Sequence, residues 1–216
     1  MQVASSKLDQ SAAPVSTVIA PAPAETSLVD DRIRRLLGDA AWWRLPQAVR
    51  RRFSRPLGSD VCVIYRGEVT EMSFSRGGWL LANLARLVGG PLPWHRETGI
   101  PCIVAVTADG LRGGQFWTRI YARLGGRPQI IHSEKRFAGP TGLEKHVGFG
   151  FGVTLVVSAT ARSLLFSGDR YFVDIGRVRL WLPRWLSPGV MTVAHSEIDP
   201  RRFAFTLDLA GEWFGP

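Results

Sequence analysis

The feature that most constrains this chain is a run of strand-like segments that no helix of useful length interrupts. From about residue 100 to 210, nine such segments follow one another, separated by short turns rich in Gly, Pro and Asp. A parallel pair of strands needs a connection of a dozen or more residues, so the pairing should be antiparallel. The segments read "IPCIVAVTAD", "GQFWTRIYARL", "PQIIHSEKRF", "FGVTLVVSAT", "SLLFS", "RYFVDI", "RVRLWLP", "VMTVAHSE" and "FAFTLDLA".

The preceding third of the chain mixes one further strand with helices. Residues 60–74, "DVCVIYRGEVTEMSF", are β-branched and aromatic-rich, as is typical of a strand. Residues 75–90, "SRGGWLLANLARLVGG", predict a helix that two glycines and a following "PLP" end. Its predicted apolar face consists of Leu80, Leu84, Leu87 and Val88. We therefore expect an α+β fold, predominantly antiparallel β: a strongly curved sheet or barrel-like meander of about ten strands, with two or three helices in the N-terminal third.

Composition divides the chain into three parts. Residues 1–28 are rich in Ala, Pro and Ser and predict a disordered tail, residues 29–58 a basic helical segment, and residues 59–216 the β-rich domain. No apolar run approaches the roughly 20 residues that span a bilayer, and the N-terminus does not resemble a signal peptide. We place the protein in the cytoplasm by default.

The net charge of +9 is concentrated in one segment. Residues 32–55 hold eight arginines against the single acid Asp39, which accounts for +7. The same segment contains Trp42, Leu45 and Val49, which suit a docked helix with a solvated basic face. Because the rest of the chain is nearly neutral and has no nucleic-acid-binding motif, nucleic acid is an unlikely partner. The alternative is an interaction module that binds an acidic partner or a membrane surface.

The tripeptide His-Ser-Glu occurs twice, at His132 to Glu134 and at His195 to Glu197. Residues two apart in a strand share a face, so each histidine can act with its own glutamate. Two imidazoles and two carboxylates on facing strands could hold a divalent metal or form an acid–base cluster. The four residues are therefore the candidates for both a metal site and a catalytic site.

The flanking residues predict on which face of the sheet these pairs lie. His195 and Glu197 continue the face of Met191, and His132 and Glu134 continue that of Ile130, so both pairs are expected to face inward. The simpler interpretation is structural, because a buried histidine needs a partner for its ring nitrogens and a nearby carboxylate supplies one.

Two further groups are candidates for ligand contacts. Trp117, Arg119 and Tyr121 share one face of a strand and could stack on or clamp an anion; the alternative is a barrel exterior covered by long side chains. The stretch "RFAGPTGLEKH" predicts a loop in which Thr141 caps a short turn. The ligand-contacting candidates in this stretch are Arg136, Glu144 and His146.

Several blocks of sequence resemble a known family. "FWTRIY" (116–121), "PQIIHSEKRFAGPTGLEKHVG" (128–148), "LPRWLSPG" (182–189) and "RFAFTLDL" (202–209) are similar, in order, to the bacterial domain of unknown function 4166, over roughly residues 45–216. The resemblance implies no established activity. Similar members stand alone or follow an enzyme module such as a saccharopine-dehydrogenase-like NAD-binding domain, which implies an accessory role and association with an oxidoreductase.

These observations favour a binding function over catalysis. No Gly-x-Gly-x-x-Gly fingerprint and no Gly-x-Ser-x-Gly elbow is present, so no cofactor is expected, with a divalent metal as the alternative. The leading hypothesis is an accessory or ligand-binding domain that holds a small anionic or amphipathic molecule in the concavity of the sheet. The runner-up is a metal-dependent or acid–base enzyme that uses the two His-Ser-Glu pairs.

Overall fold

The computed structural model describes residues 2–9, 29–89 and 92–210. Within these ranges the chain forms four α-helices, two short 3-10 helices and eleven strands, all in one antiparallel sheet. The helices are α1 (Arg32–Leu37), α2 (Asp39–Arg44), α3 (Gln47–Phe53) and α4 (Arg76–Leu84), with η1 (Ala85–Val88) and η2 (Arg184–Leu186). The strands are β1 (Gln2–Asp9), β2 (Cys62–Glu71), β3 (Ile100–Asp109), β4 (Gly114–Tyr121), β5 (Gln129–Arg136), β6 (Glu144–Gly148), β7 (Phe151–Ala159), β8 (Ser163–Ile175), β9 (Val178–Trp181), β10 (Val190–Glu197) and β11 (Arg202–Ala210).

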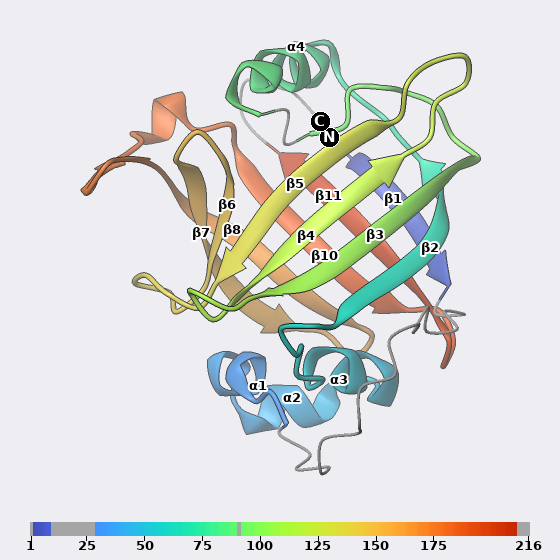
Figure 1. Cartoon of the computed structure of the whole chain (residues 1–216), viewed down its shortest axis with the longest axis vertical. Coiled ribbons are helices and arrows are strands. Elements are labelled where there is room, and N and C mark those ends of the chain that lie inside the picture. The colour runs from blue at the N-terminus through green and yellow to red at the C-terminus, as the bar shows by residue number, and fades with distance from the viewer. Residues whose placement is uncertain (1, 10–28, 90–91, 211–216) are drawn as a thin grey trace.

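The sheet curls until its ladder of strands meets itself (Figure 1). The strand order is β10-β11-β1-β2-β3-β4-β5-β6-β7-β8-β9, and β10 also pairs with the first half of β8. Strand β9 pairs with the second half of β8 and lies outside this ring. The predicted antiparallel, barrel-like fold is confirmed. Because β8 and β10 pair, the ring of described strands has no edge strand, whereas the edge strands of an open sheet would expose rows of unpaired backbone N–H and C=O groups.

The core fills the inside of the curled sheet. Along β11, Phe203, Phe205, Leu207 and Leu209 are buried while the residues between them are partly exposed, as the alternation in "FAFTLDL" predicts. Each large apolar side chain buried in this way contributes about 1.5–3 kcal/mol.

Helices close the two ends of the barrel. In Figure 1, α1, α2 and α3 gather at one end and α4 lies at the other. Trp42 and Val49 from the basic segment join the core, which confirms that this segment docks through its apolar side chains. The segment contains two helices before Pro46, because Gly38 adopts a φ of 81° and interrupts the helical run.

Helix α4 packs differently from the prediction. Its N-cap is Ser75, whose hydroxyl accepts a hydrogen bond of 3.1 Å from the amide of Gly78. The buried residues of α4 are Gly78 and Ala82, whereas Leu80 and Leu84 are more than half exposed. The predicted leucine face is therefore wrong as a core face, since the small residues Gly78 and Ala82 take the buried positions and Leu84 lines a pocket at this end of the barrel.

Three strand predictions need correction. Residues 2–9 form β1 between β11 and β2, so the predicted disordered tail over 1–28 is wrong for them; residues 10–28 lie outside the described residues. Backbone pairing on both sides explains how so polar a segment becomes a strand. Residues 144–148 form β6 and not a capped turn, and "SLLFSGDRYFVDI" forms the single strand β8.

Among the described residues, no helix has the length and hydrophobicity to cross a membrane.

Candidate functional site

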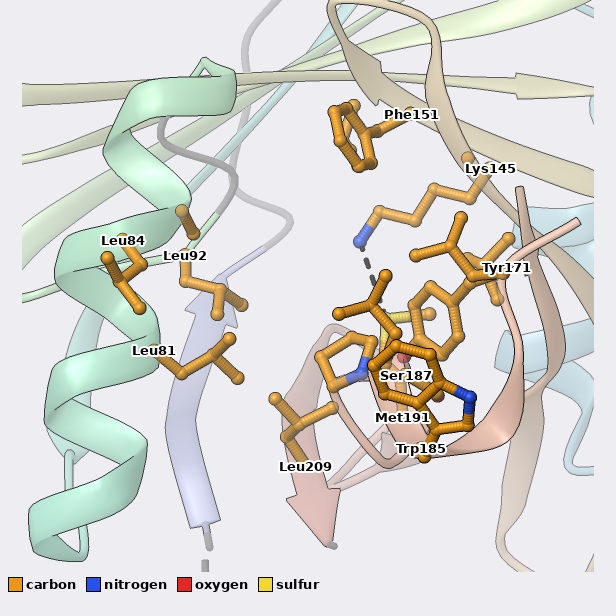
Figure 2. Close-up of a pocket in the computed structure, with 17 residues that line it drawn as sticks. Leu81, Leu84, Leu92, Lys145, Phe151, Tyr171, Trp185, Ser187, Met191 and Leu209 are labelled. Carbon is orange, nitrogen blue, oxygen red and sulfur yellow. Dashed lines mark hydrogen bonds between the residues drawn. The ribbon is translucent and has the colours of Figure 1, made fainter. Parts of the chain in front are cut away.

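The main candidate site is an apolar pocket of about 580 Å³ between α4 and the inner face of strands β6–β8, β10 and β11. Figure 2 shows leucines of α4 facing the strands across it, with Trp185 at its side. Its lining residues are Leu81, Leu84, Ala85, Leu92, Lys145, Val147, Phe151, Gly152, Val153, Tyr171, Leu182, Trp185, Leu186, Ser187, Pro188, Met191 and Leu209.

Lys145 supplies the only amine in this lining, and it comes from β6. Its Nζ points into the pocket (Figure 2) and donates only to the sulfur of Met191, 3.9 Å away, which is a weak acceptor. Among the described residues, no carboxylate lies within ion-pairing distance of this amine. Burial, followed by the nearby charge of Arg119, lowers the pKa of Lys145 to about 7.

Two more cations lie inside the barrel near Lys145. Arg119 donates from Nη1 to the hydroxyl of Ser133 at 3.1 Å, and the amine of Lys135 lies 4.0 Å from the centre of the Phe166 ring. Burial lowers the pKa of Lys135 well below its ordinary value, and the charges of Arg119 and Lys145 lower it further. In the described part of the chain, neither Arg119 nor Lys135 forms an ion pair with an acid. Buried charge without a counter-charge costs several kcal/mol, so this interior favours neutral lysines or a bound anion.

An open groove of about 700 Å³ lies on the outer face of strands β3–β8 and is lined by both polar and apolar side chains. Unlike the interior cations, its charged residues are paired. Arg136 Nη2 donates to Glu134 at 2.6 Å, and His146 Nε2 lies 3.1 Å from a carboxylate oxygen of Glu144. Glu144 is only 1% exposed and forms a two-pronged ion pair with Arg179, which continues at 2.8 Å to Asp174.

The structure separates the two His-Ser-Glu pairs. His132 is exposed on the outer face, where its Nδ1 lies 2.9 Å from the hydroxyl of Thr118, and Glu134 faces the outer groove. His195 is completely buried inside the barrel. The prediction that both pairs face inward is therefore wrong for the first pair, and one metal or catalytic site made from all four residues is ruled out. In β5 the inward positions include the polar Ser133 and Lys135, so the alternation of polarity is misleading.

His195 lacks the carboxylate partner that was expected. Neither of its ring nitrogens has a hydrogen-bond partner in the described part of the chain, and five aromatic rings with centres at 5.0–6.1 Å surround it. These rings belong to Phe53, Trp117, Phe166, Phe203 and Phe205. Burial lowers the pKa of His195 far below its ordinary value, so it is a neutral member of an aromatic cluster. Glu197 is half-buried at the end of β10.

The other candidates divide between the two faces. Trp117, Arg119 and Tyr121 are buried inside the barrel, so the alternative of an exterior position is wrong for them. Arg136 and His146 line the outer groove, with Glu144 bonded to His146.

Lys145, the amine of the inner pocket, was missed. It lies between Glu144 and His146 in β6. Because side chains alternate between the two faces of a strand, a strand prediction for this segment places Lys145 on the face opposite to Glu144 and His146.

No group of three or more His, Cys, Asp or Glu side chains suited to a metal ion occurs within residues 2–9, 29–89 and 92–210. The arrangement can instead exclude water from an apolar molecule and present one amine to a polar group on it. Association with an oxidoreductase and the binding role of the Arg-rich segment stay predictions.

In searches of curated proteins and of solved structures, no significant match to the chain was found. A sequence model of one family does match, over residues 45–216, which extend from the end of α2 through β11 and cover all the pocket-lining residues. The chain therefore belongs to the family Domain of unknown function (DUF4166).

Proposed function

We propose that the barrel binds a small amphipathic molecule with an apolar body and an acidic head, such as a medium-chain carboxylate. The observation that carries this proposal is the amine of Lys145, which projects into an otherwise largely apolar pocket without an acidic partner among the described residues. A pocket of about 580 Å³ falls in the range that small ligands occupy.

The two ends of such a ligand would meet different surfaces. Leu81 and Leu84 of α4 and Trp185 of η2 would cover the apolar chain. Leu84 and Trp185 are more than half exposed without a ligand, so their burial would contribute at about 25 cal/mol per Å². The acidic head would accept a charge-assisted hydrogen bond from Lys145, with Arg119 adding to the positive potential.

The lowered pKa gives this binding a defined pH dependence. Because the pKa of Lys145 is about 7 in the ligand-free protein, much of the amine is neutral above that pH. An anion pairs with the protonated amine, so binding takes up a proton there and affinity should increase as the pH falls from 8 to 6. The carboxylate of the ligand itself stays largely ionised over this range.

The test is displacement of a neutral environment-sensitive dye from the barrel by dodecanoate and by dodecanol, which differ only in the head group. We expect dodecanoate to bind about 10–100-fold more tightly than dodecanol at pH 6, because a hydrogen bond to a charged group is worth about 1.5–3 kcal/mol. Lys145→Met should remove this preference and keep dodecanol binding. Lys135→Met is the matched control, since Lys135 is also buried but does not line the pocket, and it should keep most of the preference.

Three results would contradict the proposal. The dye and both ligands would fail to bind the folded protein, dodecanoate and dodecanol would bind equally to the wild type, or Lys145→Met would leave the preference unchanged.

A further inference from the structure

The amine of Lys145 has the surroundings of a nucleophile as well as those of a charge anchor. It is buried, it reaches an apolar pocket, and the one hydrogen bond of its Nζ among the described residues is to the weak acceptor Met191 Sδ. Amines that are desolvated and lie near other cations stay neutral and become reactive toward carbonyl groups. The cation here is Arg119, whose charge adds to burial in lowering the pKa of Lys145.

We infer that Lys145 forms a Schiff base with apolar aldehydes or ketones that enter the barrel pocket. This inference rests on the proposed function, since the carbonyl compound would occupy the space assigned to the amphipathic ligand. It adds a covalent activity to that site and names a second class of ligand, the aliphatic carbonyl compounds.

The step balances without an oxidant or a reductant. The lone pair of Nζ forms a bond to the carbonyl carbon, and the electron pair of the C=O π bond moves to the oxygen, which takes up a proton. The resulting carbinolamine loses water, made from the former carbonyl oxygen and the two protons of the amine, and a C=N bond remains. Tyr171 lines the same pocket, and burial raises the pKa of its hydroxyl, so it stays a neutral group during this step.

The side chains around Lys145, which come from strands β4, β5, β8 and β10, favour the neutral form of its amine. Arg119 on β4 repels a proton on Nζ, burial lowers the pKa of Lys135 on β5 well below its ordinary value, and Tyr171 on β8 and Met191 on β10 carry no charge. The carboxylate of Glu144 is directed to the outer face, where Arg179 holds it. Adduct formation should therefore decrease as the pH falls from 8 to 6, the opposite of the dependence predicted for a carboxylate ligand.

The experiment is reductive trapping of the full chain with decanal and cyanoborohydride, followed by peptide mass mapping. The chain has only three lysines, Lys7, Lys135 and Lys145, and one N-terminal amine, so each site can be read separately. We expect one dominant adduct on Lys145, heavier by the mass of decanal less one oxygen atom. Excess dodecanol should suppress this adduct, and Lys135→Met should retain it.

Folding and pocket occupancy are followed in the same samples with the neutral dye, so two failures can be told apart. If the dye binds and dodecanol displaces it but Lys145 is trapped no faster than the N-terminal amine, the covalent inference is overturned and the binding function stands. If neither the dye nor decanal associates with the folded protein, both the inference and the proposed function fail. Lys145→Met, with dye binding retained and no adduct at the pocket, is the expected result for the variant.

Discussion

The inner and outer faces of strand β6 hold their charges in opposite ways. On the outer face, Glu144 is buried but neutralised by Arg179 and bonded to His146. On the inner face, Lys145 has only a thioether for a partner among the described residues. Two consecutive residues of one strand therefore differ: Glu144 belongs to an ion-pair network, whereas Lys145 faces the pocket without a counter-charge in the described part of the chain. Paired buried charges are explained by the fold itself, and we propose that the unpaired amine of Lys145 marks a ligand site.

The largest change in stability should follow from breaking the ion-pair network of Glu144 and Arg179 on the outer face. Arg179→Met would leave the carboxylate of Glu144 buried without its cation, and such a loss costs about 3–5 kcal/mol. We expect the free energy of unfolding, measured in urea, to decrease by about that amount. Arg177→Met, at an exposed position in the β8–β9 turn, is the control and should change stability by less than about 0.5 kcal/mol. Equal, small effects of the two substitutions would show that the network does not stabilise the barrel.

Removing the inner charge, that of Lys145, should instead increase the free energy of unfolding. The pKa of Lys145 is about 7 in the folded protein against an ordinary value of 10.5, so the unfolded chain holds more protons between these values. Stability should therefore rise with pH from about 7 to 10, and the penalty of the buried charge is fully present below 7. At pH 6 we expect Lys145→Met to stabilise the ligand-free protein by about 2 kcal/mol, less than the roughly 5 kcal/mol of the full shift because side chains and water relax around the charge.

The measurement is urea unfolding of the wild type and of Lys145→Met at pH 6 and pH 10. The advantage of the variant should nearly vanish at pH 10, where the lysine of the folded wild type is neutral. A variant that is less stable than the wild type at pH 6 would show that Lys145 has an acidic partner in the ligand-free protein.

The smallest effect should come from His132, the exposed histidine of the first His-Ser-Glu copy. His132→Ala removes only the surface contact with Thr118, so the free energy of unfolding should change by less than about 0.5 kcal/mol. Affinity for dodecanoate should stay the same, because His132 lies on the opposite face of the sheet from the pocket. A weakening of dodecanoate binding beyond about threefold would place the ligand in the outer groove and contradict the assignment of the pocket.

The fold could be predicted largely from local pattern, whereas the site could not. Turn residues and β-branched segments predict the order and antiparallel pairing of the strands, because both depend on near neighbours in sequence. Local pattern could not predict which residues of β5 face the barrel interior. Its inward positions carry the polar residues Ser133 and Lys135, whereas the apolar Ile130 faces outward and is half exposed. The pocket is lined by residues of α4, β6 and β10, which are more than 40 residues apart in sequence, and no local pattern predicts that they share a cavity.

The segment around Lys145 shows the same limit more sharply. Gly139 and Gly142, both with φ near 75°, predict a loop correctly, but the strand that follows is short, and its pairing with β5 and β7 has no signal in its local pattern. The family resemblance was confirmed over residues 45–216, and it carries no activity that could have identified the amine.

A crystal structure of the protein with dodecanoate at pH 6 tests the central claim most directly. We expect electron density for the ligand inside the barrel, with a carboxylate oxygen about 2.8 Å from Nζ of Lys145 and the alkyl chain lying between Leu81 of α4 and Met191 of β10. Density for the ligand in the outer groove, or in the pocket with its carboxylate in solvent and Lys145 still against the sulfur of Met191, would contradict it.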